Sequence, residues 1–480
     1  MFVARERELT ELGDAYETGS FQMAVVYGRR RVGKTALLRR FVSDKKNAIF
    51  FTARQTVARE NLEALSAALA TRDTYPGEIY PDEAYPDSYI PTSHPIYQSF
   101  SDALLALFRR AQRERVVIVI DEYPYLAESE PSVSSVLQSL IDEYGATSKL
   151  FLVLCGSSMS FMKEQVLGEK SPLYGRRTLQ IELKPFDVFD SARLLGTADP
   201  VRAVELYALV GGVPQYLRQL DASRTIEWNI ANRLLGVGAY LSEEADNFLS
   251  QEVRSPAAYN AIIAAIAGGC VRPQEIADRT QIRSPLVQQY LVRLEKLALV
   301  RRVVPVVGAK KRQVRYEIAD NLFRFRYHFG TKYALAVDAG MGDMVAREIV
   351  GRELSTFVGP VFEDVARQWL MRQMAAGAID VIPLGVGTWW GTNPRTRHEE
   401  EVDVVVRGAH ELLLGECKWT DAPVDSSVLG TLRRRASLLD GGDNAQLYLF
   451  SKSGFEAECV QRAHSNGGAA LVTVEEMFSG

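Results

Sequence analysis

The fold of the first part of this chain is indicated by the segment Gly28-Arg29-Arg30-Arg31-Val32-Gly33-Lys34-Thr35. It follows the apolar run Val25-Val26-Tyr27 and precedes Ala36-Leu37-Leu38, which opens a predicted helix. A loop of the form G-x-x-x-x-G-K-T between a strand and a helix is typical of a phosphate-binding loop, because its glycines let backbone N–H groups converge on phosphate oxygens. Lys34 adds positive charge there, and the Thr35 hydroxyl is a ligand for Mg²⁺. The sequence therefore predicts that residues 28–35 bind a nucleoside triphosphate, ATP, together with Mg²⁺.

A second predicted strand ends in two acidic residues. The run Val116–Ile120 is continuous and β-branched, which is typical of a strand buried on both faces of a parallel sheet. Asp121 and Glu122 follow it, at the sheet edge where ligands of α/β proteins bind. Asp121 is predicted to hold Mg²⁺, and Glu122 to polarise the attacking water. The alternative is that these carboxylates only mark the point where the chain returns to solvent.

Two further segments complete the predicted ATPase site. The run 149–155 reads as another buried strand and leads into Ser157 and Ser158, either of which can orient the hydrolytic water. Downstream, Arg176 and Arg177 precede a short strand-like stretch. One of these arginines is predicted to stabilise the γ-phosphate charge in the transition state, as arginine fingers do. A solvated basic pair is the alternative for Arg176 and Arg177.

These motifs, in this order, resemble the archaeal-type ATPases of the AAA+/STAND group over roughly the first half of the chain. The resemblance implies that Ser157 or Ser158 is the sensor, and that Arg176 or Arg177 acts in trans from a neighbouring subunit of a homo-oligomer. It also implies that the retained Glu122 supports hydrolysis rather than a slow nucleotide switch. The opening box is expected beside the adenine, although alanine replaces the usual glycine in it. The segments that carry the resemblance are Phe2-Val3-Ala4-Arg5-Glu6-Arg7-Glu8-Leu9, the phosphate loop, Ile120-Asp121-Glu122, Cys155-Gly156-Ser157-Ser158, Leu173-Tyr174-Gly175-Arg176-Arg177 and the lid motif Gly211-Gly212-Val213-Pro214-Gln215-Tyr216-Leu217.

The composition is that of a multidomain globular protein. A chain of 480 residues, 47% hydrophobic and 24% charged, is long enough for about three to four domains, with enough apolar material for sizeable cores. The N-terminus shows no signal peptide, and no apolar run reaches the length of a membrane span. The four cysteines lack metal-ligand spacing, so free thiols in a reducing compartment are expected. These features predict a cytoplasmic protein without membrane segments.

A basic island interrupts the otherwise acidic chain. Residues 255–335 contain fourteen Lys/Arg against five Asp/Glu, although the whole chain carries a net charge of −4. Such an island is typical of a nucleic-acid contact. Three helix-like segments and a basic hairpin follow one another here, with Ser284 as the expected N-cap of the third helix and Pro285 at its first position. This order resembles a winged helix-turn-helix, with DNA as the partner. The predicted contacts are Ser284, Gln288, Gln289 and Arg293 on the recognition helix and Lys310, Lys311 and Arg312 at the wing tip. The alternative is a winged helix that contacts only protein.

A second chemical signal lies near the C-terminus. Asp403 sits in the strand-like run Glu399–Val406, and thirteen residues later Glu416 and Lys418 stand two apart in the next predicted strand. That spacing places Glu416 and Lys418 on one face. Asp403 and Glu416 are predicted to hold Mg²⁺ or Mn²⁺, and Lys418 to orient or activate water. An upstream amphipathic helix is predicted to supply Glu363 as a further ligand. An ordinary hairpin with solvated charges is the alternative.

The motifs Thr388-Trp389-Trp390-Gly391, Glu401-Val402-Asp403 and Gly415-Glu416-Cys417-Lys418-Trp419 resemble the PD-(D/E)XK nuclease-like domain that accompanies many archaeal-type ATPases. The resemblance covers roughly residues 345–480 and implies a restriction-endonuclease-like α/β fold. Val402 stands where the name of the superfamily has proline. The sequence leaves open whether this domain cleaves DNA.

The predicted architecture is therefore α/β, in four parts: a P-loop AAA+ core at 1–197, a helical lid at 198–254, a winged helix-turn-helix at 255–335 and the nuclease-like domain at 345–480. A Tyr-Pro repeat at 75–89 is expected to form an extended loop. We expect an AAA+ ATPase that controls a fused metal-dependent DNA nuclease, in defence or mobile-element biology. The alternative is an ATP-dependent DNA- or protein-binding switch whose nuclease-like domain is inactive.

Overall fold

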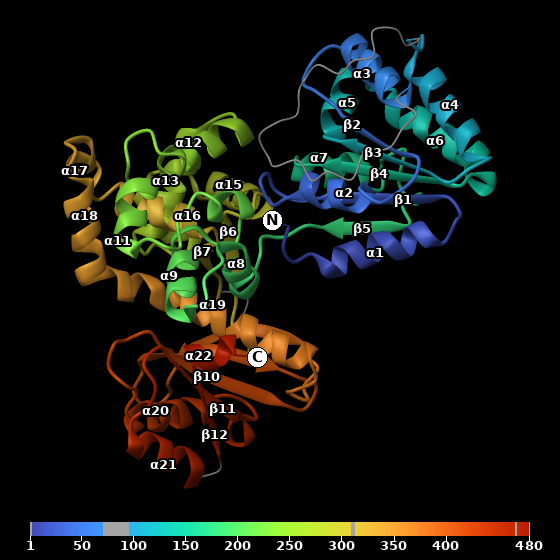
Figure 1. Cartoon of the computed structure of the whole chain (residues 1–480). Helices are drawn as coiled ribbons and strands as arrows, with labels where there is room; N and C mark the ends of the chain where they lie inside the picture. Colours follow the sequence, from blue (N-terminus) through green and yellow to red (C-terminus); the bar gives the residue numbers. More distant parts are fainter. Residues whose placement is uncertain (1, 71–95, 309–312, 466–467, 480) are drawn as a thin grey trace. The chain divides into compact units, whose positions relative to one another are not determined.

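The computed structural model describes residues 2–70, 96–308, 313–465 and 468–479 (Figure 1). It contains two compact units, Met1–Lys184 and Pro185–Gly480. Two predicted features, the Tyr-Pro repeat at 75–89 and the wing tip at 310–312, lie outside the described residues. The units divide after Lys184, while the predicted domain boundary at residue 197 stays a prediction.

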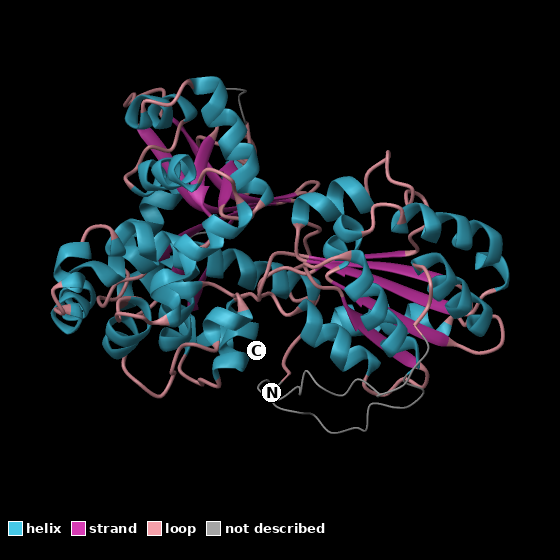
Figure 2. Ribbon diagram, turned by 90° about the horizontal axis from the view of Figure 1, so that it is seen from above, coloured by secondary structure: helices cyan, strands magenta, loops and turns pink. Residues whose placement is uncertain are grey.

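The first unit is built on a five-stranded, entirely parallel sheet (Figures 1 and 2). Its strand order is β2-β3-β4-β1-β5, so crossovers place β4 between β1, which leads into the phosphate loop, and β3, which leads into the acidic pair. This sheet with its helices matches a P-loop AAA+ core. The strands are β1 Gln22–Tyr27, β2 Ala48–Thr52, β3 Val116–Asp121, β4 Leu150–Gly156 and β5 Leu179–Glu182.

Helices cover both faces of this sheet. Along β1, Met23 and Val25 enter the core on one face, whereas Ala24 and Val26 enter the core on the other face, because successive side chains of a strand alternate. This double burial explains why the strands read as continuous apolar runs. Helices α3–α6 pack on the first face and helices α1 and α2 on the second. The helices are α1 Glu6–Glu17, α2 Lys34–Val42, α3 Ala58–Ala70, α4 Phe100–Ala111, α5 Tyr123–Ser129, α6 Val133–Tyr144 and α7 Met159–Phe161.

The second unit opens with a helical segment, followed by three helices and a two-stranded antiparallel sheet. In the third of these helices, α15, Val287, Leu291 and Leu294 are buried at helical spacing and share one core with residues of α13, α14 and β6. The elements are α8 Val188–Leu195, α9 Pro200–Val210, α10 Pro214–Leu217, α11 Ile226–Asn229, α12 Tyr240–Glu252, α13 Pro256–Ala267, α14 Pro273–Thr280, α15 Ser284–Lys296, β6 Val300–Val303, β7 Arg315–Ile318, α16 Asn321–Phe325, α17 Ala334–Asp338 and α18 Gly342–Glu348.

One expected cap is wrong. Helix α15 begins at Ser284 itself, so its N-cap is Arg283 and the Ser284 side chain makes no capping hydrogen bond. Pro285 still lies in the first turn, where its missing N–H costs nothing. The hairpin strands β6 and β7 are also shorter than the apolar runs that predict them.

The remainder of the second unit is a mixed five-stranded sheet of order β12-β11-β10-β9-β8. The β8–β9–β10 part is antiparallel, and β10, β11 and β12 are parallel. Residues of α20 and α21 share a core with one face of this sheet, and aromatic contacts such as Phe362–Trp419 place α19 on the other. The elements are α19 Leu354–Ala375, β8 Gly385–Thr392, β9 Glu399–Arg407, β10 Leu412–Lys418, α20 Ser426–Ala436, β11 Gln446–Ser451, α21 Ala457–Ser465, β12 Ala469–Thr473 and α22 Val474–Phe478.

Among the residues that the structure describes, no helix combines the length and the apolar character needed to cross a membrane.

Candidate functional site

The first candidate site lies at the carboxyl ends of three neighbouring strands of the parallel sheet. Strand β4 lies between β1 and β3, with Tyr27 opposite Gly156 and Ile120 opposite Leu154. The residues that follow each strand therefore meet at one edge, which is where open α/β sheets bind their ligands. The phosphate loop, the acidic pair and the predicted sensor serines all come from these three strand ends.

The loop after β1 keeps its glycines for steric reasons. A Cβ on Gly28 would stand 2.3 Å from the backbone oxygen of Leu183, so no side chain fits there. Gly33, at the start of α2, has a φ of 93°, in the left-handed region that favours glycine. The loop thus runs close to the neighbouring backbone and then turns sharply into the helix, whose N-terminus favours anions.

Lys34 is buried within this loop. Its Nζ donates hydrogen bonds of 3.0 Å to the carbonyl oxygens of Gly28 and Arg29. Burial lowers the pKa of Lys34, and the nearby Cys155 and Glu122 partly oppose that shift. A buried ammonium favours an anionic partner, so this position fits a phosphate group.

Thr35 and Asp121 form the contact that joins the two predicted motifs. The Thr35 hydroxyl donates a 2.8 Å hydrogen bond to Oδ2 of Asp121, and Oδ1 of Asp121 accepts from the N–H of Glu122 at 3.1 Å. One hydroxyl and one carboxylate are a sparse ligand set, which is what Mg²⁺ uses when water and phosphate oxygens complete its octahedron. The residues present fit an ATP-bound Mg²⁺ ion.

Glu122 is held by the next strand. Its Oε2 accepts hydrogen bonds from the Ser157 hydroxyl at 3.0 Å and from the Ser157 N–H at 3.3 Å. The Glu122 backbone is left-handed, with a φ of 52°, which turns its carboxylate toward the end of β4. The structure thus brings Ser157 onto the predicted base, whereas Ser158 is half-buried at the start of α7.

The two candidate arginine fingers differ in their surroundings. Arg176 forms a two-pronged ion pair with Asp142, with nitrogen–oxygen distances of 2.8 and 2.6 Å. It also donates to the carbonyl oxygen of Pro172 at 2.9 Å. Arg177 is exposed and forms no ion pair with a described residue. Of the two, Arg177 is the side chain accessible to another molecule.

The N-terminal box is tied to the phosphate loop. Arg5 donates to the carbonyl oxygen of Val32 at 3.2 Å and to that of Lys184 at 2.6 Å. Ala4 is buried with a φ of 57°, in the left-handed region that favours glycine. The substitution by alanine therefore keeps the turn at a conformational cost.

The second candidate site lies where β9 and β10 diverge. The antiparallel register pairs Val404 with Gly415, and its continuation sets Asp403 opposite Glu416. Residues directly opposite each other point to the same face, and Lys418, two positions on, shares that face. The N–H of Cys417 donates to Oδ2 of Asp403 at 2.9 Å, which holds the two strands together at this point.

Glu416 is paired with two cations. Oε1 accepts from Lys418 at 2.8 Å, and Oε2 accepts from Arg435, on α20, at 2.8 Å. Arg435 also contacts Glu400 at 3.1 Å, so it joins the start of β9 to the predicted metal ligand. The sequence analysis missed Arg435. The signal was the run Arg433-Arg434-Arg435, but nothing in it shows which arginine faces the sheet.

Glu363, the predicted further ligand, lies on α19. Its Oε2 lies 3.8 Å from Arg367, which also donates to the carbonyl oxygen of Asp403 at 2.5 Å. Burial raises the pKa of Glu363, and the nearby Asp403 raises it further. Burial likewise raises the pKa of Asp403, with Glu416 adding to the shift. Half-buried carboxylates whose charged form is disfavoured in this way are stabilised by a cation.

The described residues contain no group of three His, Cys, Asp or Glu side chains arranged as a ready set of metal ligands. Asp403 and Glu416 therefore remain a pair, with Glu363 behind them. Such a pair fits a hard divalent cation that keeps several water ligands.

The predicted DNA-contact residues are partly accessible. Gln288 and Gln289 are exposed on α15. Arg293 is half-buried and donates to the carbonyl oxygen of Glu252 at 3.4 Å. Part of the basic island is neutralised within the second unit, since Arg315 pairs with Glu399 and with Glu401.

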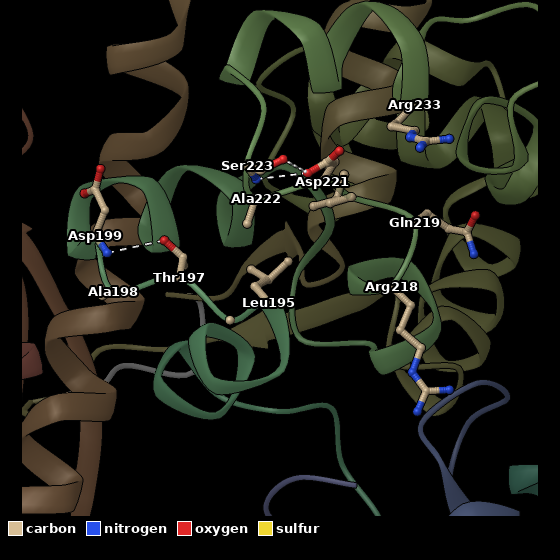
Figure 3. A pocket seen from close by; sticks show the side chains of 12 residues that line it. Leu195, Thr197, Ala198, Asp199, Arg218, Gln219, Asp221, Ala222, Ser223 and Arg233 are labelled. Carbon is tan, nitrogen blue, oxygen red and sulfur yellow. Dashed lines mark hydrogen bonds between the residues drawn. The ribbon is translucent and has the colours of Figure 1, made fainter. Parts of the chain in front are cut away.

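An open polar hollow of about 660 Å³ lies in the segment predicted as the lid (Figure 3). Its walls are the loop 195–199, the loop 218–223 and Arg233. Its hydrogen bonds are local, such as the 2.9 Å bond from Ser223 N–H to Asp221. It contains none of the predicted site residues, and we assign it no ligand.

Two family matches agree with this geometry. Residues 2–220 match an ATPase domain predominantly from Archaea. Residues 327–429 match a family of archaeal and bacterial proteins of unknown function. The first match spans the phosphate loop, the acidic pair, Ser157 and the lid motif. The second spans α19, β8, β9 and β10.

Individual proteins give the same picture. An uncharacterized protein of Methanocaldococcus jannaschii is 27% identical over 99% of this chain and 100% of its own length. An uncharacterized ATP-binding protein of that organism is 44% identical over 46 residues, which are 10% of this chain and 78% of that protein. A Walker-type ATPase of Pyrococcus abyssi has a similar fold, with a TM-score of 0.51 and 22% identity, over 68% of this chain and 96% of that chain.

Proposed function

Residues 2–220 match the ATPase domain found predominantly in Archaea, and on this premise we propose that the chain binds Mg²⁺·ATP at residues 28–35 and hydrolyses it with Glu122 as the general base. The contact between Thr35 and Asp121, at 2.8 Å, carries this proposal. It joins two residues 86 positions apart into the pair that such a reaction requires.

Each residue of the site has a distinct task in this mechanism. The loop N–H groups and Lys34 bind the β- and γ-phosphates, and Thr35 with Asp121 would hold Mg²⁺, which offsets phosphate charge when bound. Glu122 accepts the proton of the attacking water. Ser157 fixes the Glu122 carboxylate through its 3.0 Å hydrogen bond, so the base is positioned before the water arrives.

ATP turnover by two variants tests this assignment. Glu122→Gln should bind ATP and turn it over at least about 100-fold more slowly, because an amide cannot accept the proton. Lys34→Ala should lose binding itself, because it removes the charge at the phosphates. Equal turnover by wild type and Glu122→Gln would remove Glu122 from the role of base.

We propose further that the second unit carries a metal-dependent DNA-cleaving centre. Asp403 and Glu416 would hold the divalent cation, which when bound stabilises charge on the scissile phosphate. Lys418 orients the attacking water, and Glu363 would be a further ligand of the cation from α19. The support is the shared face of Asp403, Glu416 and Lys418, together with the half-buried carboxylate of Glu363, whose pKa is raised by burial and by the nearby Asp403.

Lys418→Ala separates binding from chemistry at this centre. The variant should bind Mn²⁺ about as tightly as wild type, because both carboxylates remain, yet fail to cleave DNA. Isothermal titration with Mn²⁺ and a plasmid-cleavage assay measure the two properties. Cleavage by Lys418→Ala at the wild-type rate would exclude the lysine from the mechanism.

A regulatory switch is the second candidate function. The observation that favours it is that both oxygens of Glu416 are already engaged, by Lys418 and Arg435. A nuclease-like domain whose Glu416 stays paired with Lys418 and Arg435 would act as a scaffold. ATP would then control the binding of DNA or protein by the predicted ATPase core, lid and winged helix. ATP-dependent binding without any metal-dependent cleavage is the result that would select this candidate.

DNA and a second copy of the chain are the proposed partners. Gln288 and Gln289 are exposed on α15, where a recognition helix would contact bases, and the basic island supplies positive charge. Arg177 is exposed and suits a role in the ATP site of a neighbouring copy. Fluorescence anisotropy with labelled duplexes, and sedimentation with and without ATP, test these partners.

A further inference from the structure

The β6–β7 hairpin, read from the sequence as a wing for DNA, packs against the C-terminal sheet. Val306, after β6, donates its N–H to the carbonyl oxygen of Thr388 on the edge strand β8 at 3.0 Å. The side chains of Val306 and Val307 pack on the core of that sheet. The hairpin thus covers the free edge of the sheet that holds the second candidate site.

Charged residues of the hairpin reinforce this docking. Arg315, on β7, stacks over the ring of Trp390 at 4.2 Å and lies 3.2 Å from the Glu401 carboxylate. It also pairs with Glu399. An arginine engaged by two carboxylates and an aromatic ring is not available to a DNA phosphate. At least this strand of the hairpin faces protein.

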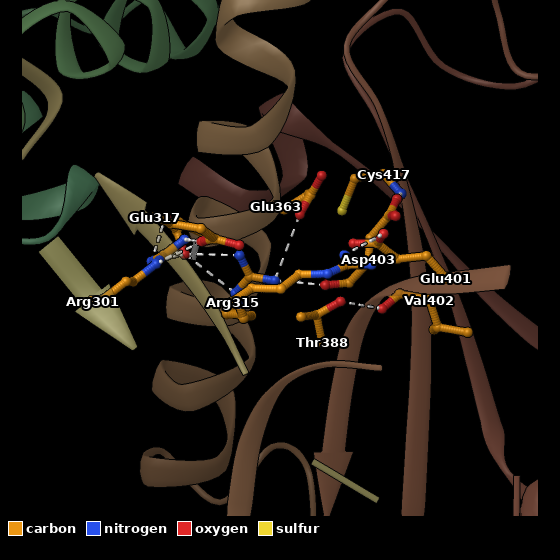
Figure 4. Close-up of polar contacts among 11 residues, drawn as sticks. Arg301, Arg315, Glu317, Glu363, Thr388, Glu401, Val402, Asp403 and Cys417 are labelled. Atoms are coloured by element: carbon orange, nitrogen blue, oxygen red, sulfur yellow. Dashed lines mark hydrogen bonds and ion pairs between the residues drawn. The ribbon is translucent and has the colours of Figure 1, made fainter. Parts of the chain in front are cut away.

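A chain of ion pairs leads from the hairpin into the carboxylate cluster (Figure 4). Arg301, on β6, contacts both oxygens of Asp364 at 2.8 and 2.9 Å. Asp364 accepts from Arg367 at 2.8 Å, one helical turn along α19. Arg367 in turn donates to the carbonyl oxygen of Asp403 and faces Glu363 at 3.8 Å.

We propose that Arg301 is a positioning residue for the second candidate site: through Asp364 it fixes Arg367, and Arg367 fixes Glu363 and Asp403 relative to each other. The inference rests on the proposed metal centre of Asp403 and Glu416. It makes the hairpin part of that centre. Partners that support metal ligands from outside commonly change metal affinity by 10- to 100-fold when they are lost.

Arg302 provides a matched control. It follows Arg301 on β6, so it points to the opposite side of the hairpin, and it is exposed. Arg301→Ala and Arg302→Ala remove the same kind of side chain from two neighbouring positions. A general weakening of the hairpin would affect both variants, whereas loss of the ion-pair chain affects only the first.

The test is Mn²⁺ binding to the full-length, nucleotide-free protein, followed by electron paramagnetic resonance. The binding that wild type shows and Asp403→Ala lacks defines the signal of the centre. Arg301→Ala should weaken that binding about tenfold, Arg302→Ala should leave it unchanged, and Arg301→Lys should recover part of it. Equal affinity in Arg301→Ala and wild type overturns the proposal, and so does an equal loss in both alanine variants.

A folding control and the Asp403-dependent signal distinguish a failure of the role of Arg301 from a failure of the proposed metal centre. If Arg301→Ala fails to fold, as judged by its circular dichroism melting curve, Arg301→Lys decides: weaker binding supports the positioning role and wild-type binding overturns it. If wild type has no Mn²⁺ binding that depends on Asp403, the proposed metal centre fails, independently of Arg301.

Discussion

Gly28→Ala perturbs the phosphate loop at its tightest point. The new Cβ would stand 2.3 Å from the backbone oxygen of Leu183 and 3.3 Å from a methyl of Val32, whereas ordinary contacts begin at 3.4 Å. Leu183 is itself fixed, because its N–H donates to the carbonyl oxygen of Tyr27 at 2.7 Å. The loop and the end of β5 must therefore separate by about 1 Å, and overpacking of this kind costs about 1–3 kcal/mol.

That displacement should appear in both stability and activity. A shift of about 1 Å in a group that positions substrate costs on the order of 100-fold in rate, so ATP turnover should fall to about one hundredth. Thermal unfolding followed by circular dichroism measures the stability, and a coupled phosphate-release assay measures turnover.

Gly13→Ala is the matched control. Gly13 lies in helix α1, and a Cβ there meets no atom within 4 Å. That variant should be stabilised by about 0.5–1 kcal/mol, because alanine loses less entropy in a helix, and its turnover should stay unchanged. If Gly28→Ala behaves like Gly13→Ala in both assays, the close approach of the loop to Leu183 is not what the site requires.

Three further predictions concern other parts of the chain. Ala4→Gly should raise the free energy of unfolding by about 0.5–1 kcal/mol in chemical denaturation, because the alanine has a left-handed φ of 57°; a loss of stability contradicts this. Arg177→Ala should lower ATP turnover most at high protein concentration, where subunits meet. Arg176→Ala should mainly lower the melting temperature, because it breaks the ion pair with Asp142. If Arg176→Ala lowers turnover and Arg177→Ala lowers the melting temperature instead, the two roles are exchanged. Burial lowers the pKa of His328, so the unfolded chain binds the proton more tightly, and the free energy of unfolding should decrease as the pH falls below about 6.5. In His328→Leu the free energy of unfolding should change less between pH 7 and 5. An unchanged pH dependence in this variant refutes the role of His328.

Local sequence patterns were enough to predict the strands, loop and helix that surround the first candidate site. Each segment that forms this site is continuous in the sequence and has its own pattern of apolar and turn residues. These segments are the phosphate loop, Val116–Ile120 and the strand before Ser157. The α/β core with a parallel sheet is confirmed, because buried parallel strands must read as apolar runs. The contact of Thr35 with Asp121 agrees with the rule that the carboxyl ends of such strands share an edge. The roles of these residues stay predictions.

Contacts between distant segments were beyond the sequence. Arg301 and Asp364 lie 63 residues apart, and no periodic pattern marks them as partners. Arg435 could not be told from its two arginine neighbours, because the face of α20 that meets the sheet depends on the packing of β9 and β10. The basic island was read as a DNA surface because charge was counted along the chain. Its pairing with acidic residues such as Glu401 appears only in three dimensions.

The same limit applies to the wing. Its strands were predicted from the runs 299–307 and 312–318, and no pattern in these runs indicates that Val306 donates a hydrogen bond to β8. A strand edge can pair with any compatible edge, so the choice depends on the rest of the fold.

The central claim is that the second unit holds a metal-dependent nuclease centre alongside the ATPase. Cleavage of plasmid DNA in Mn²⁺ by wild type and by Asp403→Ala, with ATP turnover followed in the same samples, tests it most directly. Asp403→Ala should lose cleavage by at least about 100-fold and keep its ATP turnover. Cleavage by Asp403→Ala at the wild-type rate, or no metal-dependent cleavage by wild type with ATP turnover intact, would contradict it.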